Sequence, residues 1–230
     1  MEIKRFVCRV LSENSYVLSE GDSCVVVDPG FYGQEELGRI TGYLDGRVPD
    51  AILLTHGHFD HCLGAKPLQD AWPGVPVYMH PADEPIVHEA EGIMRSLNLH
   101  GADFSFRWIP VFDGQTISFG SLSFKVIATP GHTPGGVCWY CESLALAFTG
   151  DTLFADAIGR TDFPYSDYDS EIRSIMEKLV LLPGATDVFP GHGGPTTIER
   201  ERSSNPFLEP FNEPGETFDE DLPGIELKPF

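Results

Sequence analysis

Short apolar runs of strand length recur through most of the chain, separated by polar or glycine-containing turns. Runs rich in Val, Ile, Phe and Tyr between turn residues are typical of β-strands. The run AILLT at residues 51–55 is almost continuously apolar, which is typical of a strand buried on both faces. We therefore expect strands at residues 3–9, 14–20, 23–30, 51–55, 75–80, 115–120, 122–130, 136–142, 144–151 and 187–192.

Between these runs the apolar positions change to helical spacing. The clearest case is DSEIRSIMEKLVLL at 169–182, which is acidic at its start, basic near its end and apolar along one face. The segment 83–97 has the same amphipathic pattern with an acidic first turn, and glycines weaken the pattern at 34–45. We expect helices at residues 34–45, 63–71, 83–97, 169–182 and 196–203.

The order of these elements indicates the fold class. Strands dominate each half of the chain, and helices alternate among them. Two mixed β-sheets that face each other, with helices on the outer faces, would bury this pattern as a four-layer αββα sandwich. We expect one domain over residues 1–205. Residues 206–230 are rich in Pro, Glu and Asp without periodicity, so we expect an extended acidic tail there.

Composition and charge narrow the function classes. Of 230 residues, 41% are hydrophobic, which suits a folded core, and no apolar run approaches the ~20 residues that a bilayer requires. The formal net charge of −20 argues against a nucleic-acid partner. Five scattered cysteines and the absence of an apolar signal region at the start favour a cytoplasmic protein with no membrane contact.

The stretch THGHFDH at residues 55–61 places three histidines and one aspartate directly after the apolar run AILL. A metal site, a polar loop that is rich in histidine, and an acid/base cluster without metal all compete to explain it. Further residues of the same kind follow later strands: His132 in TPGHTPGG, Asp151 in FTGD and His192 in VFPGHGG. Loops at the carboxyl ends of strands converge, so these side chains are expected to meet.

Seven candidate metal ligands result: His56, His58, Asp60, His61, His132, Asp151 and His192. Imidazole and carboxylate suit zinc, iron and manganese. So many imidazoles would repel one another when protonated, and a cation removes that conflict, which favours metal over a metal-free cluster. Two metal ions sharing one carboxylate would use all seven ligands and leave open positions, as catalytic sites do.

The four motifs, in this order and spacing, resemble the metallo-β-lactamase superfamily over about residues 1–205, and the αββα sandwich of that family agrees with the expected layers. The resemblance implies how the ligands divide. The first metal would be held by His56, His58 and His132. The second would be held by Asp60, His61 and His192, with Asp151 bridging the two.

Within the superfamily, DTLFADAIGRTDFP at 151–164 and PGHGGPTTIERERSSNPFL at 190–208 most resemble the small single-domain glyoxalase II-like hydrolases. The resemblance implies a metallo-hydrolase of the hydroxyacylglutathione hydrolase type. A hydroxide bridging two divalent ions would cleave a small-molecule thioester such as S-D-lactoylglutathione, with Asp60 as a catalytic ligand that orients the hydroxide. Zinc is the expected metal, with iron or manganese as alternatives. The bridging aspartate is typical of this branch and not of the β-lactamases.

Two alternatives within the superfamily stay open. The element GRTDF at 159–163 also resembles the persulfide dioxygenases, which would hold a single iron through His56, His132 and Asp151. A hydrolase of another small acidic ester or thioester is the second alternative, because larger glyoxalase II enzymes grip glutathione with a basic helical domain and the residues after Asn205 are acidic. A metal-binding scaffold without catalysis is a third class.

Other features have two interpretations each. Arg160 could bind a substrate carboxylate through its guanidinium, or pair with Asp162 to brace the loop.

Cys138 and Cys141 form a CxxC pair within a predicted strand, where positions i and i+3 face opposite sides, so packing is favoured over redox or zinc chemistry. Residues 80–110 could cover the cleft or contact another subunit, which leaves a homo-oligomer open.

Overall fold

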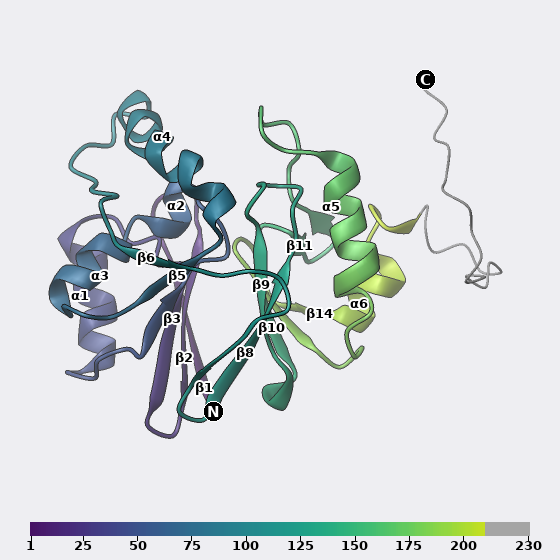
Figure 1. Ribbon diagram of the computed structural model, residues 1–230, viewed down its shortest axis with the longest axis horizontal. Helices are drawn as coiled ribbons and strands as arrows, with labels where there is room; N and C mark the ends of the chain where they lie inside the picture. The colour runs from purple at the N-terminus through teal and green to yellow at the C-terminus, as the bar shows by residue number, and fades with distance from the viewer. Residues whose placement is uncertain (210–230) are drawn as a thin grey trace.

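The computed structural model describes residues 1–209, which form two β-sheets packed face to face with helices on the outer faces (Figure 1). This arrangement is the four-layer αββα sandwich that the alternation of strands and helices predicts. Residues 210–230, which make up most of the expected acidic tail, lie outside the described part of the chain. No helix among residues 1–209 has the length and apolar character needed to cross a membrane.

The first sheet has six strands in sequence order: β1 (Glu2–Val7), β2 (Asn14–Glu20), β3 (Ser23–Val27), β4 (Ala51–Leu53), β5 (Val77–Met79) and β6 (Trp108–Pro110). The first three strands form an antiparallel meander, and β3, β4, β5 and β6 pair in parallel. The sheet is therefore mixed, as predicted. The edge strand β6 was not expected, because three residues are too few to give a recognisable period.

The second sheet has the order β14 (Thr196–Thr197), β13 (Asp187–Pro190), β10 (Leu146–Gly150), β9 (Val137–Cys141), β8 (Leu122–Ala128) and β7 (Thr116–Phe119). It is antiparallel except where β10 pairs in parallel with β13. A small hairpin of β11 (Leu153–Phe154) and β12 (Ala157–Ile158) follows β10. Its strands have two residues each and were not predicted.

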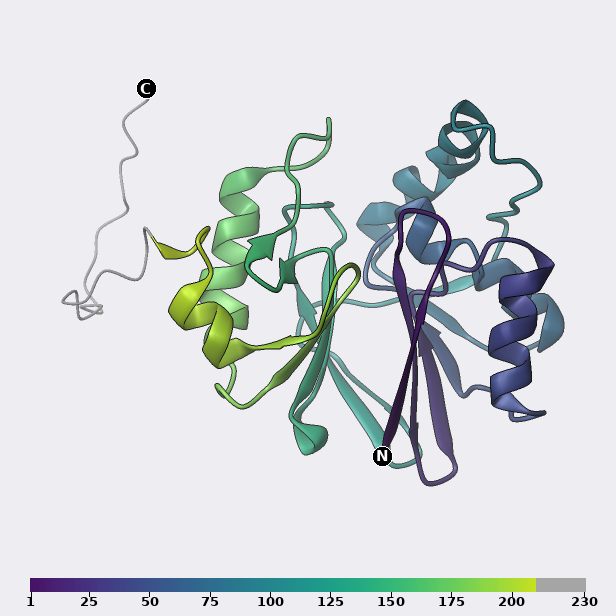
Figure 2. The same ribbon diagram turned by 180° about the vertical axis from the view of Figure 1, so that it is seen from behind.

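The helices cover the outer faces of the two sheets, as Figure 2 shows from behind. The first half of the chain supplies α1 (Gly33–Leu44), α2 (Phe59–Cys62), α3 (Ala65–Ala71), the short 3₁₀ helix η1 (Pro81–Asp83) and α4 (Glu84–Ser96). The second half supplies the 3₁₀ turn η2 (Glu142–Leu144), α5 (Tyr168–Ser174), its π-helical continuation η3 (Ile175–Leu179), and α6 (Ile198–Ser204). The expected helix at 63–71 is preceded by α2, which begins inside the THGHFDH motif.

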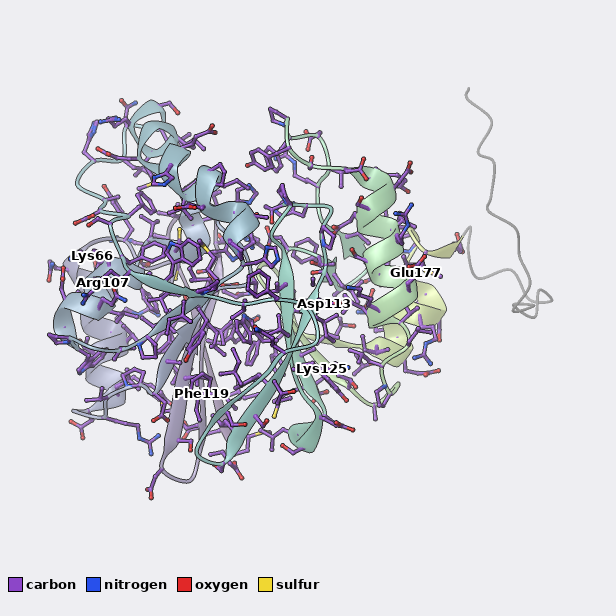
Figure 3. The ribbon with its side chains drawn as sticks, viewed as in Figure 1. Lys66, Arg107, Asp113, Phe119, Lys125 and Glu177 are labelled. Carbon is purple, nitrogen blue, oxygen red and sulfur yellow. The ribbon has the colours of Figure 1, made fainter. Side chains whose placement is uncertain are left out.

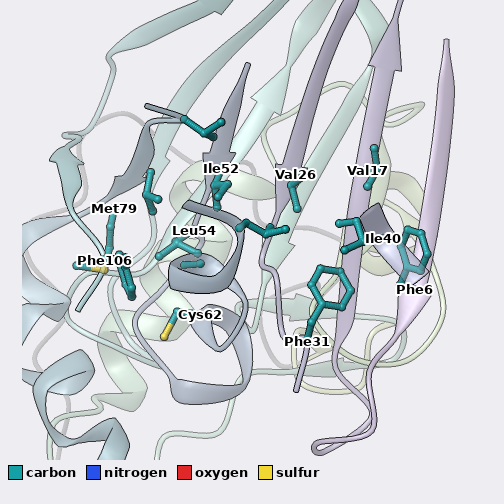
Figure 4. Close-up of a cluster of buried hydrophobic side chains, with 14 of the residues drawn as sticks. Phe6, Val17, Val26, Phe31, Ile40, Ile52, Leu54, Cys62, Met79 and Phe106 are labelled. Atoms are coloured by element: carbon teal, nitrogen blue, oxygen red, sulfur yellow. The ribbon is translucent and has the colours of Figure 1, made fainter. Parts of the chain in front are cut away.

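Alternation along β3 explains how one apolar run serves two layers. Val25 and Val27 face the second sheet, and Val26 faces the outer helices, where it packs in one cluster with Ile40 of α1 and Leu68 of α3. Figure 4 shows this outer cluster, with Val26, Ile40 and neighbouring apolar side chains packed together. Strands buried on both faces therefore need apolar residues at every position.

The core between the sheets is aromatic in the second half of the chain. Trp139 and Phe148 are fully buried there, and Phe119 of β7 lies in the same cluster. Figure 3 shows Phe119 toward the middle of the molecule, with Lys66 on α3 and Glu177 on η3 at opposite outer faces. Apolar burial of this kind supplies most of the favourable free energy of folding.

Cys138 and Cys141 lie on opposite faces of β9, as predicted. Cys138 packs against the outer helices and Cys141 against the first sheet. All five cysteines are buried and free of disulfides. At the end of the described chain, Leu208 is fully buried in the outer cluster of the second sheet, three residues beyond the expected domain boundary at 205.

We predict that Leu53→Ala lowers the free energy of unfolding by about 2–5 kcal/mol, because Leu53 is fully buried between the sheets and its removal leaves a cavity. Urea unfolding followed by circular dichroism measures the change. The matched control is Leu181→Ala, at a residue that is 73% exposed, where the change should stay within about 0.5 kcal/mol. Equal effects of the two substitutions would contradict the inter-sheet packing.

Candidate metal centre

The seven candidate ligands are brought together at the carboxyl ends of strands. His56, His58, Asp60 and His61 follow β4, and Asp60 and His61 lie in the short helix α2. The other three follow β8, β10 and β13. Side chains of the cluster could each offer a metal ion one nitrogen or oxygen, and among the described residues they form three overlapping groups: His56, His58 and His132; Asp60, His61 and His192; and Asp28, His56 and His61. The first two of these are called the first and the second group below.

In the first group, three imidazole nitrogens converge. The Nδ1 atom of His58 lies 3.0 Å from Nε2 of His56 and 3.0 Å from Nε2 of His132. Ligand atoms about 2.0–2.1 Å from one tetrahedral ion lie about 3.3 Å from one another, so this spacing is close to that of a ligand set. All three side chains are at most 9% exposed.

The opposite ring nitrogens of these histidines are held by hydrogen bonds. Nδ1 of His132 donates to the backbone carbonyl of Arg160 at 2.8 Å, which leaves Nε2 without a proton. Nδ1 of His56 lies 3.0 Å from the Thr55 hydroxyl, and that hydroxyl donates to Asp28. These partners set the tautomers so that lone pairs point into the group.

The third histidine of the group is held by an aromatic residue. The hydroxyl of Tyr165 lies 2.6 Å from Nε2 of His58. A single proton on Nδ1 of His58 could serve only one of the two neighbouring nitrogens. In at least one of the two contacts, therefore, two unprotonated nitrogens face each other with their lone pairs about 3 Å apart. A bound cation would relieve that repulsion.

In the second group, carboxylates and imidazoles alternate. Nε2 of His192 lies 3.4 Å from Oδ2 of Asp60, and Nε2 of His61 lies 3.8 Å from the same oxygen. Nε2 of His61 and Oδ1 of Asp151 are buried and have no hydrogen-bond partner, although they lie 3.4 Å apart. Buried polar atoms without partners are costly, so their presence fits a metal ion as the missing partner.

Asp151 contacts both groups. Its Oδ2 atom lies 3.6 Å from Nε2 of His132 in the first group and 3.5 Å from Nε2 of His192 in the second. One carboxylate is thus placed where it could bridge two cations, and the donor set as a whole fits a pair of divalent ions.

Burial and mutual repulsion determine the protonation of the first group. Burial, together with the charges of neighbouring histidines, lowers the pKa of His56 well below its ordinary value. Burial and then His132 lower the pKa of His58 to about 3. The pKa of Asp151 is also lowered, because His61 and His192 outweigh the opposing effect of burial. The neutral imidazoles of the first group and the ionised carboxylate of Asp151 are the forms that bind metal ions. In the second group the neighbouring carboxylates outweigh burial and raise the pKa of His61 and of His192.

Asp28 supports both groups and was missed by sequence reasoning. It accepts hydrogen bonds from the backbone N–H of Thr55 at 2.7 Å and from the Thr55 hydroxyl at 2.6 Å, and it lies 3.0 Å from Nδ1 of His61. Its φ of 46° lies in the left-handed region, where a non-glycine residue is uncommon. The signal in the sequence is an Asp-Pro-Gly turn directly after the strand SCVVV.

Two further buried acids, also not predicted, fix the loops around the ligands. Asp83 accepts from the backbone N–H of Gly57 and of Gly135 and from the hydroxyl of Thr133, which ties two ligand loops together. Glu171 accepts from the backbone N–H of His132 at 2.8 Å. Neither acid lies in a motif, so their roles depend on contacts that only the folded chain creates.

Two glycines are required by close approach at the centre. A Cβ atom on Gly150, whose φ is +51°, would lie 2.2 Å from the Thr55 hydroxyl oxygen. A Cβ atom on Gly191 would lie 2.3 Å from Oδ1 of Asp151. Side chains at these positions would displace Thr55 and Asp151, which explains glycine beside Asp151 and His192.

The guanidinium of Arg160 pairs with Asp162 through two hydrogen bonds of 2.8 and 2.9 Å and lies 4.8 Å from the ring centre of Phe163. The interpretation of Arg160 as a brace for its own loop therefore describes a contact that is present. The binding of a substrate carboxylate by Arg160 stays a prediction.

A cavity of about 660 Å³ opens beside the two groups. The ligands His58, Asp60, His132, Asp151 and His192 contribute to its lining, and α4 and residues 160–165 form walls. A volume of this size suits a small-molecule ligand.

The comparison with known protein families covers most of the chain. The family model for the metallo-beta-lactamase superfamily matches residues 8–192, which include all seven candidate ligands. The chain belongs to the metallo-beta-lactamase superfamily. As a member of that superfamily, it is a metal-dependent hydrolase by class. The fold implies divalent metal ions, and the groups of histidines and aspartates described above are the candidates to hold them.

Three relatives of this superfamily member show the range of the resemblance. The hydroxyacylglutathione hydrolase GloC of Haemophilus influenzae is 35% identical over 197 residues, which cover 84% of this chain and 91% of GloC. The protein TTHA1623, crystallised in a di-iron-bound form, is 37% identical with a TM-score of 0.79, over 89% of this chain and 100% of that one. The B3 metallo-beta-lactamase BLEG-1 is 34% identical with a TM-score of 0.79, over 90% and 99%.

We predict that Asp28→Asn weakens metal binding by about 10–100-fold, because the neutral amide orients His61 and Thr55 less strongly than the carboxylate. Competition with a chromophoric chelator measures the affinity, and circular dichroism checks the fold. The control is Asp22→Asn, at an exposed position, which should bind metal as the unchanged protein does. Equal affinities for both variants would remove Asp28 from the support of the ligands.

Proposed function

We propose that this hydrolase uses two divalent metal ions to cleave a small-molecule thioester, with S-D-lactoylglutathione as the reference substrate. His56, His58 and His132 would hold one ion, and Asp60, His61 and His192 the other. The observation that carries the proposal is the position of Asp151, whose Oδ2 atom lies within 3.6 Å of a histidine of each group. A reaction that needs only one metal ion would leave Asp60, His61 and His192 without a role in binding metal.

When bound, the two ions supply a water that is deprotonated near neutral pH and polarise the carbonyl of the substrate. The protein does the rest. Its cavity brings the thioester against the two groups. The contact of the Tyr165 hydroxyl with His58, and the hydrogen bond that His132 donates to the Arg160 carbonyl, hold the two rings in their orientations. Asp60 at the start of α2 accepts a hydrogen bond from the attacking water and thereby orients it. The departing thiolate needs no acid, because thiols have a pKa near 8.5.

Thioester cleavage is preferred to other reactions on two grounds. GloC, at 35% identity, is named a hydroxyacylglutathione hydrolase. The motif resemblance makes Asp151 the bridging aspartate, a ligand that is typical of the glyoxalase II-like branch. BLEG-1, at similar identity, makes a lactam the competing hydrolytic substrate. The GRTDF element keeps a mononuclear iron persulfide dioxygenase as the alternative outside hydrolysis, and another small acidic ester or thioester remains a second alternative.

The identity of the metal and the cellular compartment are part of the same proposal. Zinc is the metal we expect, while the di-iron-bound form of TTHA1623 supports iron as the alternative, and manganese would suit the same donors. Five buried, free cysteines suit a reducing compartment, which supports a cytoplasmic location. The partner is a small molecule, with neither nucleic acid nor membrane involved.

We predict that the purified protein cleaves S-D-lactoylglutathione and binds about two metal ions per chain. Loss of absorbance by the thioester measures the first, and elemental analysis of protein without added metal measures the second. Oxygen consumption with glutathione persulfide and about one iron per chain would contradict the hydrolase and support the dioxygenase. Faster cleavage of a cephalosporin than of any thioester would favour a lactam substrate.

We further predict that His192→Ala reduces thioester hydrolysis roughly 100-fold or more and lowers the metal content toward one ion per chain, because the second group loses a ligand. The matched control is His88→Ala, whose side chain is 75% exposed on α4. A dioxygenase that uses only His56, His132 and Asp151 would keep its activity in His192→Ala, which separates the two reactions.

A further inference from the structure

The cavity beside the metal centre has walls from both halves of the molecule. Ile93 and Glu89 come from α4, and Phe163, Pro164 and Tyr165 come from the loop that leads into α5. Figure 1 shows α4 and this loop rising at the same edge of the sandwich, one over each sheet. Five of the candidate ligands line the same cavity, so a substrate that reaches them lies beside these walls.

The walls are largely apolar and remain accessible. Ile93, Phe154, Phe163 and Tyr165 line the cavity and are only partly buried, and Leu11, which also lines it, is 61% exposed. Leu11 also has a φ of 54°, a left-handed conformation that disfavours a branched side chain. Accessible apolar side chains gathered in one cavity beside reactive groups are typical of a ligand site.

The aromatic surface begins directly at the ligands. The ring centre of Phe163 lies 5.3 Å from that of His58 and 5.7 Å from that of His132. Tyr165 stacks against Phe163 with ring centres 6.0 Å apart and an interplanar angle of 18°. An apolar group bonded to the scissile carbonyl carbon or sulfur would therefore meet this surface as the thioester reaches the centre.

The cavity offers little to a substrate with several charges. Arg160 is the one Lys or Arg among its described lining residues, and one edge of its guanidinium, Nε and Nη2, is already paired with Asp162. Glu89 adds a negative charge to the opposite wall. Glutathione carries two carboxylates, and carboxylates that lose water without gaining a cation are costly.

We propose, on the basis of the thioester hydrolase function above, that the preferred substrates are thioesters with an uncharged aromatic or branched apolar arm. That arm lies between Ile93 of α4 and the Phe163–Tyr165 stack, with Leu11 closing the outer side. Recognition then comes from the apolar arm, and the glutathione moiety contributes little.

Binding tests the inference without turnover. S-Benzylglutathione and S-methylglutathione are thioethers that the enzyme does not cleave, and calorimetry gives their affinities for the metal-loaded protein. We expect the benzyl compound to bind roughly 10- to 100-fold more tightly, because its ring is buried. Ile93→Ala and Phe163→Ala should reduce this ratio severalfold. The controls Leu97→Ala, at the end of α4, and Phe112→Ala alter residues that are 50% and 48% exposed and should preserve it.

Kinetics separates this inference from the function on which it rests. The ratio of kcat/KM for S-mandeloylglutathione to that for S-D-lactoylglutathione should be roughly 10 or more and should fall in Phe163→Ala. Cleavage of both thioesters with equal efficiency, together with equal thioether affinities, would overturn the apolar preference and leave thioester hydrolysis standing. Cleavage of neither would overturn the thioester function, and the substrate inference with it, whatever the thioether affinities.

Discussion

The metal centre depends on lone pairs that converge inside the protein with no protons to separate them. Each inward-facing nitrogen of His56 and His132 is kept unprotonated by a hydrogen bond on the opposite side of its ring. Such an arrangement is unfavourable in an empty, buried site. It is retained because the surrounding contacts hold the rings in place, and a cation converts the repulsion into coordination.

The sandwich provides those contacts through its buried strands. Ligands leave the ends of β4, β8, β10 and β13, and buried acids behind them accept hydrogen bonds from the loop backbone. Asp28 is central among these acids, since it reaches His61 directly and His56 through Thr55. The two groups of ligands therefore share one anchor on the first sheet, which makes their geometry a single unit.

The layers, and the residues that converge at the candidate metal centre, could be predicted from the sequence because both leave a local signal. Strands such as 51–53 are apolar at every position, and His56, His58, Asp60 and His61 fall within one short motif. The supporting acids could not be predicted in the same way. Asp83 accepts hydrogen bonds from Gly57, 26 positions before it, and from Thr133, 50 positions after it, and Tyr165 reaches His58 across 107 positions. The strands β6, β11 and β12 are defined by their pairing partners and are too short to show a period.

The walls of the cavity are separate from the parts that carry the ligands. Helix α4 and residues 163–165 contribute no side chain to either ligand group, although they border both. Exchanges at Ile93 and Phe163 can therefore change which molecules are accepted while both ligand groups stay in place, whereas Tyr165 also contacts His58 and belongs to its support. The same sandwich can in this way support enzymes with different substrate specificities, which share one reactive centre and differ in the residues that line the cavity.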